Sequence, residues 1–163
     1  MQQKDIEIIK HLRQNARVSL ADISRDTGMP ISTVFDKLNK LQNAVIDKYS
    51  PLLNFEKLGY SLRIDFLIKF IDYEKGKEFL VNSKSVNSLY RVNNSFDFLA
   101  ETIFINMIGV EDFLNELNKL GIKRIMRYDV ISEIKKETFL TDLTEDIPGD
   151  IIQQDEVKQV QVI

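Results

Sequence analysis

The chain has 163 residues, of which 44% are hydrophobic and 29% charged, so it can form one large or two small globular domains. It contains no cysteine, which excludes disulfides, thiolate metal sites and cysteine nucleophiles. No run approaches the roughly 20 apolar residues of a membrane span. Residues 1–5 lack the apolar segment of a secretory signal, so we expect a cytoplasmic protein with no membrane partner.

The net charge of −3 is unevenly distributed along the chain. Residues 1–50 carry eight Lys/Arg and six Asp/Glu, and residues 51–139 carry thirteen of each. Residues 140–163 carry one Lys and six Asp/Glu. The small basic excess therefore lies at the N-terminal end, and residues 140–163 are predicted to form an acidic tail.

Residues 1–50 contain the start and stop signals of three short helices. Apolar residues recur at helical spacing over Lys4–Gln14, which predicts the first helix. Ser19 is a good N-cap for a second helix, and Gly28 supplies the left-handed turn that ends it. Pro30 suits the start of a third helix that runs to Leu41. A tight turn before the third of three helices is typical of a helix-turn-helix DNA-binding domain.

The third helix has an apolar face and a polar face. At about 100° per residue, the apolar face expected in the core consists of Ile31, Val34, Phe35, Leu38 and Leu41. Hydroxyls on the opposite face suit base edges and lysines suit phosphates, so we expect that face to bind DNA. The acidic residue on that face, Asp36, would repel phosphates unless a lysine neutralises it or a cytosine amino group donates a hydrogen bond to it. The predicted contacts are Ser32, Thr33, Asp36, Lys37 and Lys40, with Arg17, Arg25 and Lys48 as phosphate-side partners.

The rest of the chain alternates strand and helix patterns. Residues 62–71 alternate with period two, residues 73–82 read as a short helix, and residues 86–92 and 98–107 read as a hairpin. A helix that ends at Gly121 and a strand over residues 122–134 complete a β-α-β-β-α-β order. We therefore predict an α+β protein: a three-helix helix-turn-helix domain (1–50), a connecting segment (51–61) and a ferredoxin-like domain (62–139).

The ferredoxin-like arrangement leaves one face of its sheet without helices. Several predicted strands carry apolar residues on both faces, for example Leu67 beside Phe66 and Leu99 beside Phe98. An open apolar face must be covered, so we expect a homodimer that forms through this sheet.

One set of motifs is spread along the chain in a fixed order and spacing. It consists of Asp5, Ile9, Leu12, Asn15–Ser19, Ile23, Ser24, Gly28, Met29, Ser32–Val34, Leu38, Leu41, Ile46–Tyr49, Leu52–Asn54 and Leu58–Tyr60. In this order and spacing the motifs resemble the Lrp/AsnC family of transcription regulators over most of the chain, to about Lys136. That resemblance implies a winged-helix-like first domain, a linker strand over residues 51–61, binding of double-stranded DNA, dimers that assemble further, and control by an amino-acid-like effector.

The resemblance also implies an effector site in the loop between the second and third strands. This loop reads Asn94-Ser95-Phe96-Asp97 here, and Phe96 and Asp97 match the family pattern. Asn94 replaces a glycine but tolerates a left-handed backbone. Ser95 replaces an acidic residue, which removes one partner for the ammonium group of an amino acid. The loop is either an effector site or only a hairpin turn.

Two other functions stay open at this stage. A tetrapyrrole-acting enzyme of the siroheme decarboxylase type shares the two-domain architecture, but the single histidine, His11, lies on the first helix, where we expect a surface residue. A ligand-sensing or assembly protein without DNA binding is the other alternative. We find no catalytic, metal-binding or cofactor motif and predict no enzyme. The acidic tail is either solvated or an arm that joins a neighbouring sheet edge or competes with DNA.

Overall fold

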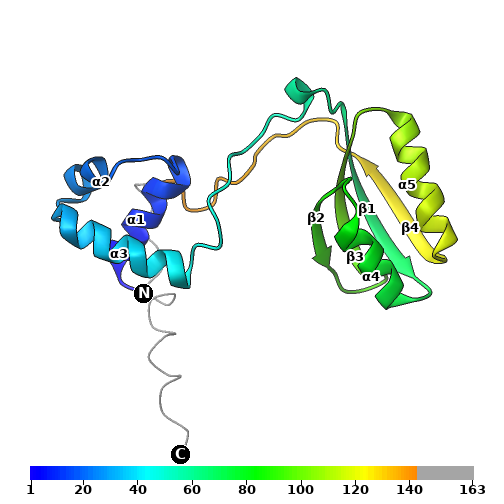
Figure 1. The fold of residues 1–163 in the computed structure, drawn as a ribbon, viewed down its shortest axis with the longest axis horizontal. Coiled ribbons are helices and arrows are strands. Elements are labelled where there is room, and N and C mark those ends of the chain that lie inside the picture. Colours follow the sequence, from blue (N-terminus) through cyan, green and yellow to red (C-terminus); the bar gives the residue numbers. More distant parts are fainter. Residues whose placement is uncertain (143–163) are drawn as a thin grey trace, which may run out of the picture. The chain divides into compact units, whose positions relative to one another are not determined.

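The computed structural model describes residues 1–142, and residues 143–163 of the predicted acidic tail lie outside the described part. The chain forms two compact units. The first combines Met1–Leu52 with the segment that begins at Lys135, and the second is Leu53–Ile134. Figure 1 shows the helices of the first unit and the sheet with its helices in the second.

Three helices build the first unit, as predicted: α1 (Gln3–Gln14), α2 (Leu20–Thr27) and α3 (Ile31–Ala44). Ser19 caps α2, because its Oγ accepts a hydrogen bond from the Asp22 amide at 3.1 Å. Gly28 ends α2 in the left-handed conformation, with φ 67°. Pro30 sits at the N-cap of α3, where its missing N–H costs no helix hydrogen bond.

The core of the first unit is an apolar cluster drawn from all three helices. Its buried members are Ile8, Ile9, Ile23, Met29, Val34 and Leu41. Leu140 packs against this cluster from the far end of the described chain. The first unit is therefore assembled from two segments of the sequence that are separated by the whole second unit.

A return segment, residues 135–142, is held against the end of α1. The Arg13 guanidinium donates to the Glu137 carboxylate at 3.0 Å and to the Phe139 carbonyl at 3.0 Å. The Gln14 side chain donates to the Thr141 carbonyl at 2.6 Å. Together with the apolar contact of Leu140, these polar contacts hold the return segment on the first unit.

Three details of the first unit differ from the sequence expectation. Ile31 and Phe35 are 53% and 51% exposed, because the buried side of α3 is centred on Val34 and Leu41. His11, expected on the surface, is buried with its Nδ1 3.9 Å from Asp26 Oδ2. The third helix, expected to run to Leu41, continues to Ala44.

The second unit is a four-stranded antiparallel sheet with two helices, in the predicted β-α-β-β-α-β order. The strand order in the sheet is β2-β3-β1-β4, which is the ferredoxin-like arrangement. The elements are β1 (Leu62–Phe70), α4 (Tyr73–Asn82), β2 (Val86–Arg91), β3 (Phe98–Phe104), α5 (Met107–Lys119) and β4 (Ile122–Asp129). Residues 51–61 contain the short 3-10 helix η1 (Glu56–Leu58) and no strand, since no described segment pairs with them.

Both helices cover the same face of this sheet. The period-two pattern of β1 places Ile64, Phe66 and Ile68 on that face, where they are fully buried. They pack in one cluster with Leu80 of α4 and Phe113 of α5. The other face carries no helix, and an apolar row crosses all four of its strands. This row consists of Tyr90, Leu99, Leu67 and Met126, each paired with the next across neighbouring strands.

Candidate nucleic-acid interface

Short polar contacts in the turn before α3 fix where that helix begins. Ser24 Oγ donates to the Met29 carbonyl at 2.5 Å, and Thr27 Oγ1 donates to the Ile23 carbonyl at 2.6 Å. Met29 is 2% exposed and anchors the turn in the core. The first turn of α3 is consequently held in a defined orientation, which a helix that reads base edges requires.

A second anchor joins α3 to the start of α1. Lys37 Nζ lies 2.6 Å from Asp5 Oδ1 and 3.0 Å from Gln2 Oε1, and both members of the ion pair are less than a fifth exposed. Burial acts to raise the pKa of Asp5, but the hydrogen bonds from Lys37 and the Gln2 amide outweigh it, so the pKa is lowered. Lys37, predicted to contact DNA, is therefore already engaged within the unit.

The outward face of α3 keeps the other predicted polar groups accessible. Ser32, Asp36 and Lys40 are exposed, and Thr33 is half-buried at the edge of this face. Within residues 1–142 no ion pair engages Asp36 or Lys40. The described part of α3 therefore offers an ammonium group, a carboxylate and a hydroxyl to a ligand along a single exposed helix face.

The predicted phosphate-side residues lie outside α3. Arg25 forms an ion pair with Asp22 on α2 at 2.8 Å, with a largely exposed guanidinium that remains able to reach another anion. Arg17 is exposed in the turn after α1, and Lys48 is exposed beyond the end of α3. Sequence reasoning missed Ile31 and Phe35, which the structure places beside the polar residues on the accessible side of α3.

The predicted effector loop is a tight hairpin between β2 and β3. Asn94 adopts the left-handed conformation, with φ 64°, and the exposed Ser95 follows it. One oxygen of Asp97 accepts from the Phe70 amide at 3.1 Å, and the other lies 3.7 Å from Lys69 Nζ. The Phe96 ring lies beneath the Arg124 guanidinium at 4.9 Å. Asp97 thus holds the end of β1, and it also lines an open cavity beside the loop.

An open cavity of about 560 Å³ borders this loop. Lys69, Lys123, Tyr73 and Asp97 supply its polar lining, and Phe70 and Ile71 supply apolar lining. Two cations and one carboxylate beside apolar carbon match the chemistry of a small zwitterion or a carboxylic acid.

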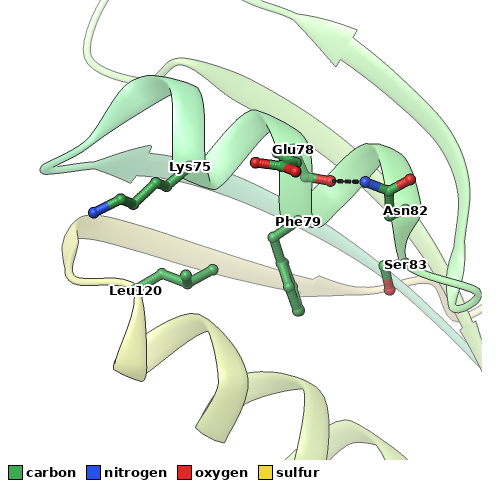
Figure 2. Close-up of a pocket in the computed structure, with 6 residues that line it drawn as sticks. All are labelled: Lys75, Glu78, Phe79, Asn82, Ser83 and Leu120. Atoms are coloured by element: carbon green, nitrogen blue, oxygen red, sulfur yellow. Dashed lines mark hydrogen bonds between the residues drawn. The ribbon is translucent and has the colours of Figure 1, made fainter.

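A second cavity, of about 320 Å³, lies between α4 and the end of α5. Figure 2 shows the Phe79 ring projecting from α4 toward the segment that carries Leu120, and Lys75 and Glu78 of α4 also line the cavity. The Asn82 amide donates to the Glu78 backbone carbonyl at 2.8 Å, so that amide is used within α4. Of the two charged lining residues, Lys75 forms an ion pair with Asp72 at 3.5 Å, outside the lining.

Three charged groups lie together on the open face of the sheet. Arg63 pairs with Glu101 at 2.6 Å, and Asp65 lies directly opposite Glu101 across β1 and β3. Burial and the neighbouring Glu101 carboxylate raise the pKa of Asp65, while Arg63 opposes the rise. One oxygen of Asp65 is buried without a hydrogen-bond partner.

Two further types of site are absent from residues 1–142. No group of three or more His, Cys, Asp or Glu could hold a metal ion there. No helix in that part of the chain is long and apolar enough to cross a membrane.

Comparisons with known proteins point to one class of protein. Residues 1–44 match the family model described as winged helix-turn-helix DNA-binding. The HTH-type transcriptional regulator FL11 of Pyrococcus abyssi is 28% identical over 140 residues, which covers 83% of this chain and 93% of that protein. The HTH-type transcriptional regulator LrpC of Bacillus subtilis is 24% identical over 137 residues, which covers 82% and 94%.

Solved structures share the fold of most of the chain. Bacillus subtilis LrpC superposes with a TM-score of 0.76 at 21% identity, covering 83% of this chain and 97% of that one. Escherichia coli AsnC gives 0.77 at 16% identity, covering 86% and 98%. A Neisseria meningitidis transcriptional regulator, solved as an L-Met complex, gives 0.77 at 20% identity, covering 93% and 99%.

Proposed function

We propose that this chain, which belongs to the Lrp/AsnC family of helix-turn-helix transcription regulators, controls transcription by binding double-stranded DNA through the outward face of α3. The observation that carries this proposal is the exposed row of Ser32, Asp36 and Lys40 on a helix whose other side is locked into the core. The first turns of such a helix read base edges, and its cations bind phosphates.

Each accessible residue has a role that follows from its chemistry. Ser32 and Thr33 are short donors and acceptors near the start of α3, where the backbone approaches base edges most closely. Asp36 accepts a hydrogen bond from a cytosine amino group, which also offsets its repulsion of phosphates. Lys40 binds a phosphate, with Arg17, Arg25 and Lys48 as further phosphate contacts. Lys37 acts indirectly, because its ammonium positions α3 against Asp5.

A direct test compares two variants of α3 with the parent on the DNA upstream of the coding region and on an unrelated fragment. Lys40→Ala is expected to weaken binding to both fragments, because a phosphate contact carries no sequence information. Thr33→Ala is expected to change the ratio between the fragments as well. Equal binding by the parent and both variants would refute the assignment of α3 as the DNA-reading helix.

We further propose that the protein is a homodimer formed through the open face of its sheet, with higher assembly built from dimers. The support is the apolar row of Tyr90, Leu99, Leu67 and Met126, which no helix covers. Leu99→Glu would place a charge in the middle of this row and is expected to yield monomers in sedimentation velocity. Val81→Glu, at a 63% exposed site on the helix side, is the matched control and should leave the dimer intact.

The effector, in this proposal, is an amino-acid-like molecule bound at Asn94, Ser95, Phe96 and Asp97 beside the cavity of about 560 Å³. Lys69 and Lys123 would pair with its carboxylate, and Asp97 would pair with its ammonium group. Because Asp97 already accepts from the Phe70 amide, ligands with a carboxylate should bind better than amines alone. Calorimetric titration of L-methionine, its amide and its deaminated acid tests this order, and tighter binding of the amide would contradict it.

A further inference from the structure

Two large apolar side chains lie exposed on the accessible side of α3. Ile31 is 53% exposed and Phe35 is 51% exposed. They are four residues apart and therefore one above the other on the helix surface. They flank the polar row proposed to read DNA, which contains Ser32 and Asp36.

The core of the first unit does not account for these two side chains. Neither belongs to the buried cluster or to the partly buried residues packed against it. Val34 and Leu41 occupy the buried side of α3, and Met29 fills the space at its start. Single exposed apolar residues are common, but two in consecutive turns form a continuous apolar strip.

We propose that Phe35, supported by Ile31, reads thymine through its C5-methyl group in the major groove. The thymine methyl is the one apolar feature that a base pair presents there, and aromatic side chains contact it. Phe35 lies in the second turn of α3, and the N-terminal turns of a recognition helix are the part that meets base edges. This inference rests on the proposed DNA-binding function and makes Phe35 a determinant of its sequence preference.

Contact with the C5-methyl group predicts a preference for thymine over uracil, which hydrogen bonds to the base would not produce. Uracil in place of thymine removes the methyl and keeps every hydrogen-bonding group of the base. Burying one methyl is worth about a four-fold change in affinity, and a dimer with two half-sites would show about sixteen-fold. Asp36 beside Phe35 would favour a cytosine nearby, so the preferred half-site combines thymine and cytosine on its major-groove edge.

The test is a two-by-two comparison of the full chain. Dissociation constants are measured by fluorescence anisotropy at one salt concentration, for the parent and for Phe35→Ala. Each protein is titrated with the upstream DNA fragment and with the same fragment made with uracil in place of thymine. The parent should bind uracil DNA about four- to sixteen-fold more weakly, and Phe35→Ala should bind both DNAs about equally.

Two further variants keep the result interpretable. Phe35→Leu retains an apolar tip and should keep part of the thymine preference, which guards against a folding defect in Phe35→Ala. Lys40→Ala should weaken binding to both DNAs and leave their ratio as in the parent, because it removes a phosphate contact. This separates loss of the methyl contact from a general loss of DNA affinity.

The possible failures are distinguishable. Salt-sensitive binding by the parent with no preference for thymine, or the same ratio in the parent and Phe35→Ala, overturns the inference and leaves the DNA-binding function standing. An unchanged ratio with altered sedimentation of Phe35→Ala would instead assign the strip to contacts between copies of the chain. If the parent binds neither DNA at low salt, the proposed function fails, and this inference fails with it.

Discussion

Lys37 and Lys40 lie one turn apart on α3, yet the structure gives them different tasks. Replacing either with methionine keeps the aliphatic stem and removes the charge. Lys37→Met breaks the ion pair with Asp5, whose oxygen lies 2.6 Å from the ammonium, and leaves a carboxylate that is only 18% exposed. Lys40→Met removes an exposed charge that no ion pair within residues 1–142 engages.

The magnitudes of the two effects follow from these environments. A hydrogen bond to a charged group is worth about 1.5–3 kcal/mol, and partial exposure places the Lys37 pair near the lower limit, at about 1.5 kcal/mol. For a unit of roughly 60 residues this lowers the Tm by roughly 6–12 °C. Lys40→Met should change stability by less than about 0.5 kcal/mol. It should also reduce the slope of log K against log salt by about one for each phosphate that Lys40 neutralises.

The pH dependence of the Lys37 effect has a defined sign. Because the folded-state pKa of Asp5 is lowered, its stabilising contribution is present above the ordinary pKa of an aspartate. That contribution is lost as the pH falls through the folded-state value. The Tm difference between Lys37→Met and the parent should therefore be largest near pH 7 and should shrink below about pH 4.

The assay is thermal unfolding followed by circular dichroism, with DNA affinity measured at temperatures where both variants are folded. The two variants should change different properties. Lys37→Met should lower stability more than DNA affinity, and Lys40→Met should lower DNA affinity more than stability. The opposite outcome is a Lys37→Met variant that keeps the stability of the parent and loses as much salt-sensitive affinity as Lys40→Met. That result would refute the structural role of the Lys37–Asp5 ion pair and assign Lys37 to a phosphate contact.

Four further predictions concern stability. Gly76→Ala should destabilise the second unit by about 1–3 kcal/mol, because the new Cβ would overlap the buried Phe70 ring, with Cε2 only 2.7 Å away. Gly109→Ala, whose nearest neighbour is 3.4 Å away, should instead stabilise it by about 0.5–1 kcal/mol, and equal urea midpoints for the two would contradict the packing. Asp65→Asn should raise the Tm at pH 7, because the raised pKa of Asp65 means that stability is lost as the pH rises above the ordinary aspartate value. This gain should disappear below about pH 4, and a gain that is independent of pH would exclude ionisation as its cause. Arg13→Lys should lower the stability of the first unit by about 1 kcal/mol, because lysine cannot replace the forked contacts to Glu137 and Phe139. Urea unfolding measures that loss, and an unchanged midpoint would show that the forked contacts of Arg13 add nothing.

The sequence predicted those features whose cause is local. The period-two pattern over residues 62–71 correctly predicted β1, because alternation follows directly from strand geometry. Ser19 and Gly28 marked both ends of α2, because a cap and a left-handed turn each need a particular residue type. The β-α-β-β-α-β order followed from these patterns taken together.

Features that depend on distant residues were not predictable in this way. Lys37 forms an ion pair with Asp5, 32 residues earlier, and no periodicity in the sequence reveals such a partner. Residues 135–142 carry no helix or strand pattern, yet they complete the first unit through Arg13 and Leu140. Ile31 and Phe35 were assigned to the core because the helical wheel gives the apolar arc but not the part of it that other helices cover.

The central claim is that the outward face of α3 binds DNA. We would measure it first by anisotropy titration of the parent and Lys40→Met, with the upstream fragment and an unrelated fragment at two salt concentrations. We predict tighter binding of the upstream fragment, a steep loss of affinity with salt, and a smaller salt dependence in Lys40→Met. Absence of binding by the parent at low salt, or identical salt dependence in the two proteins, would contradict the account.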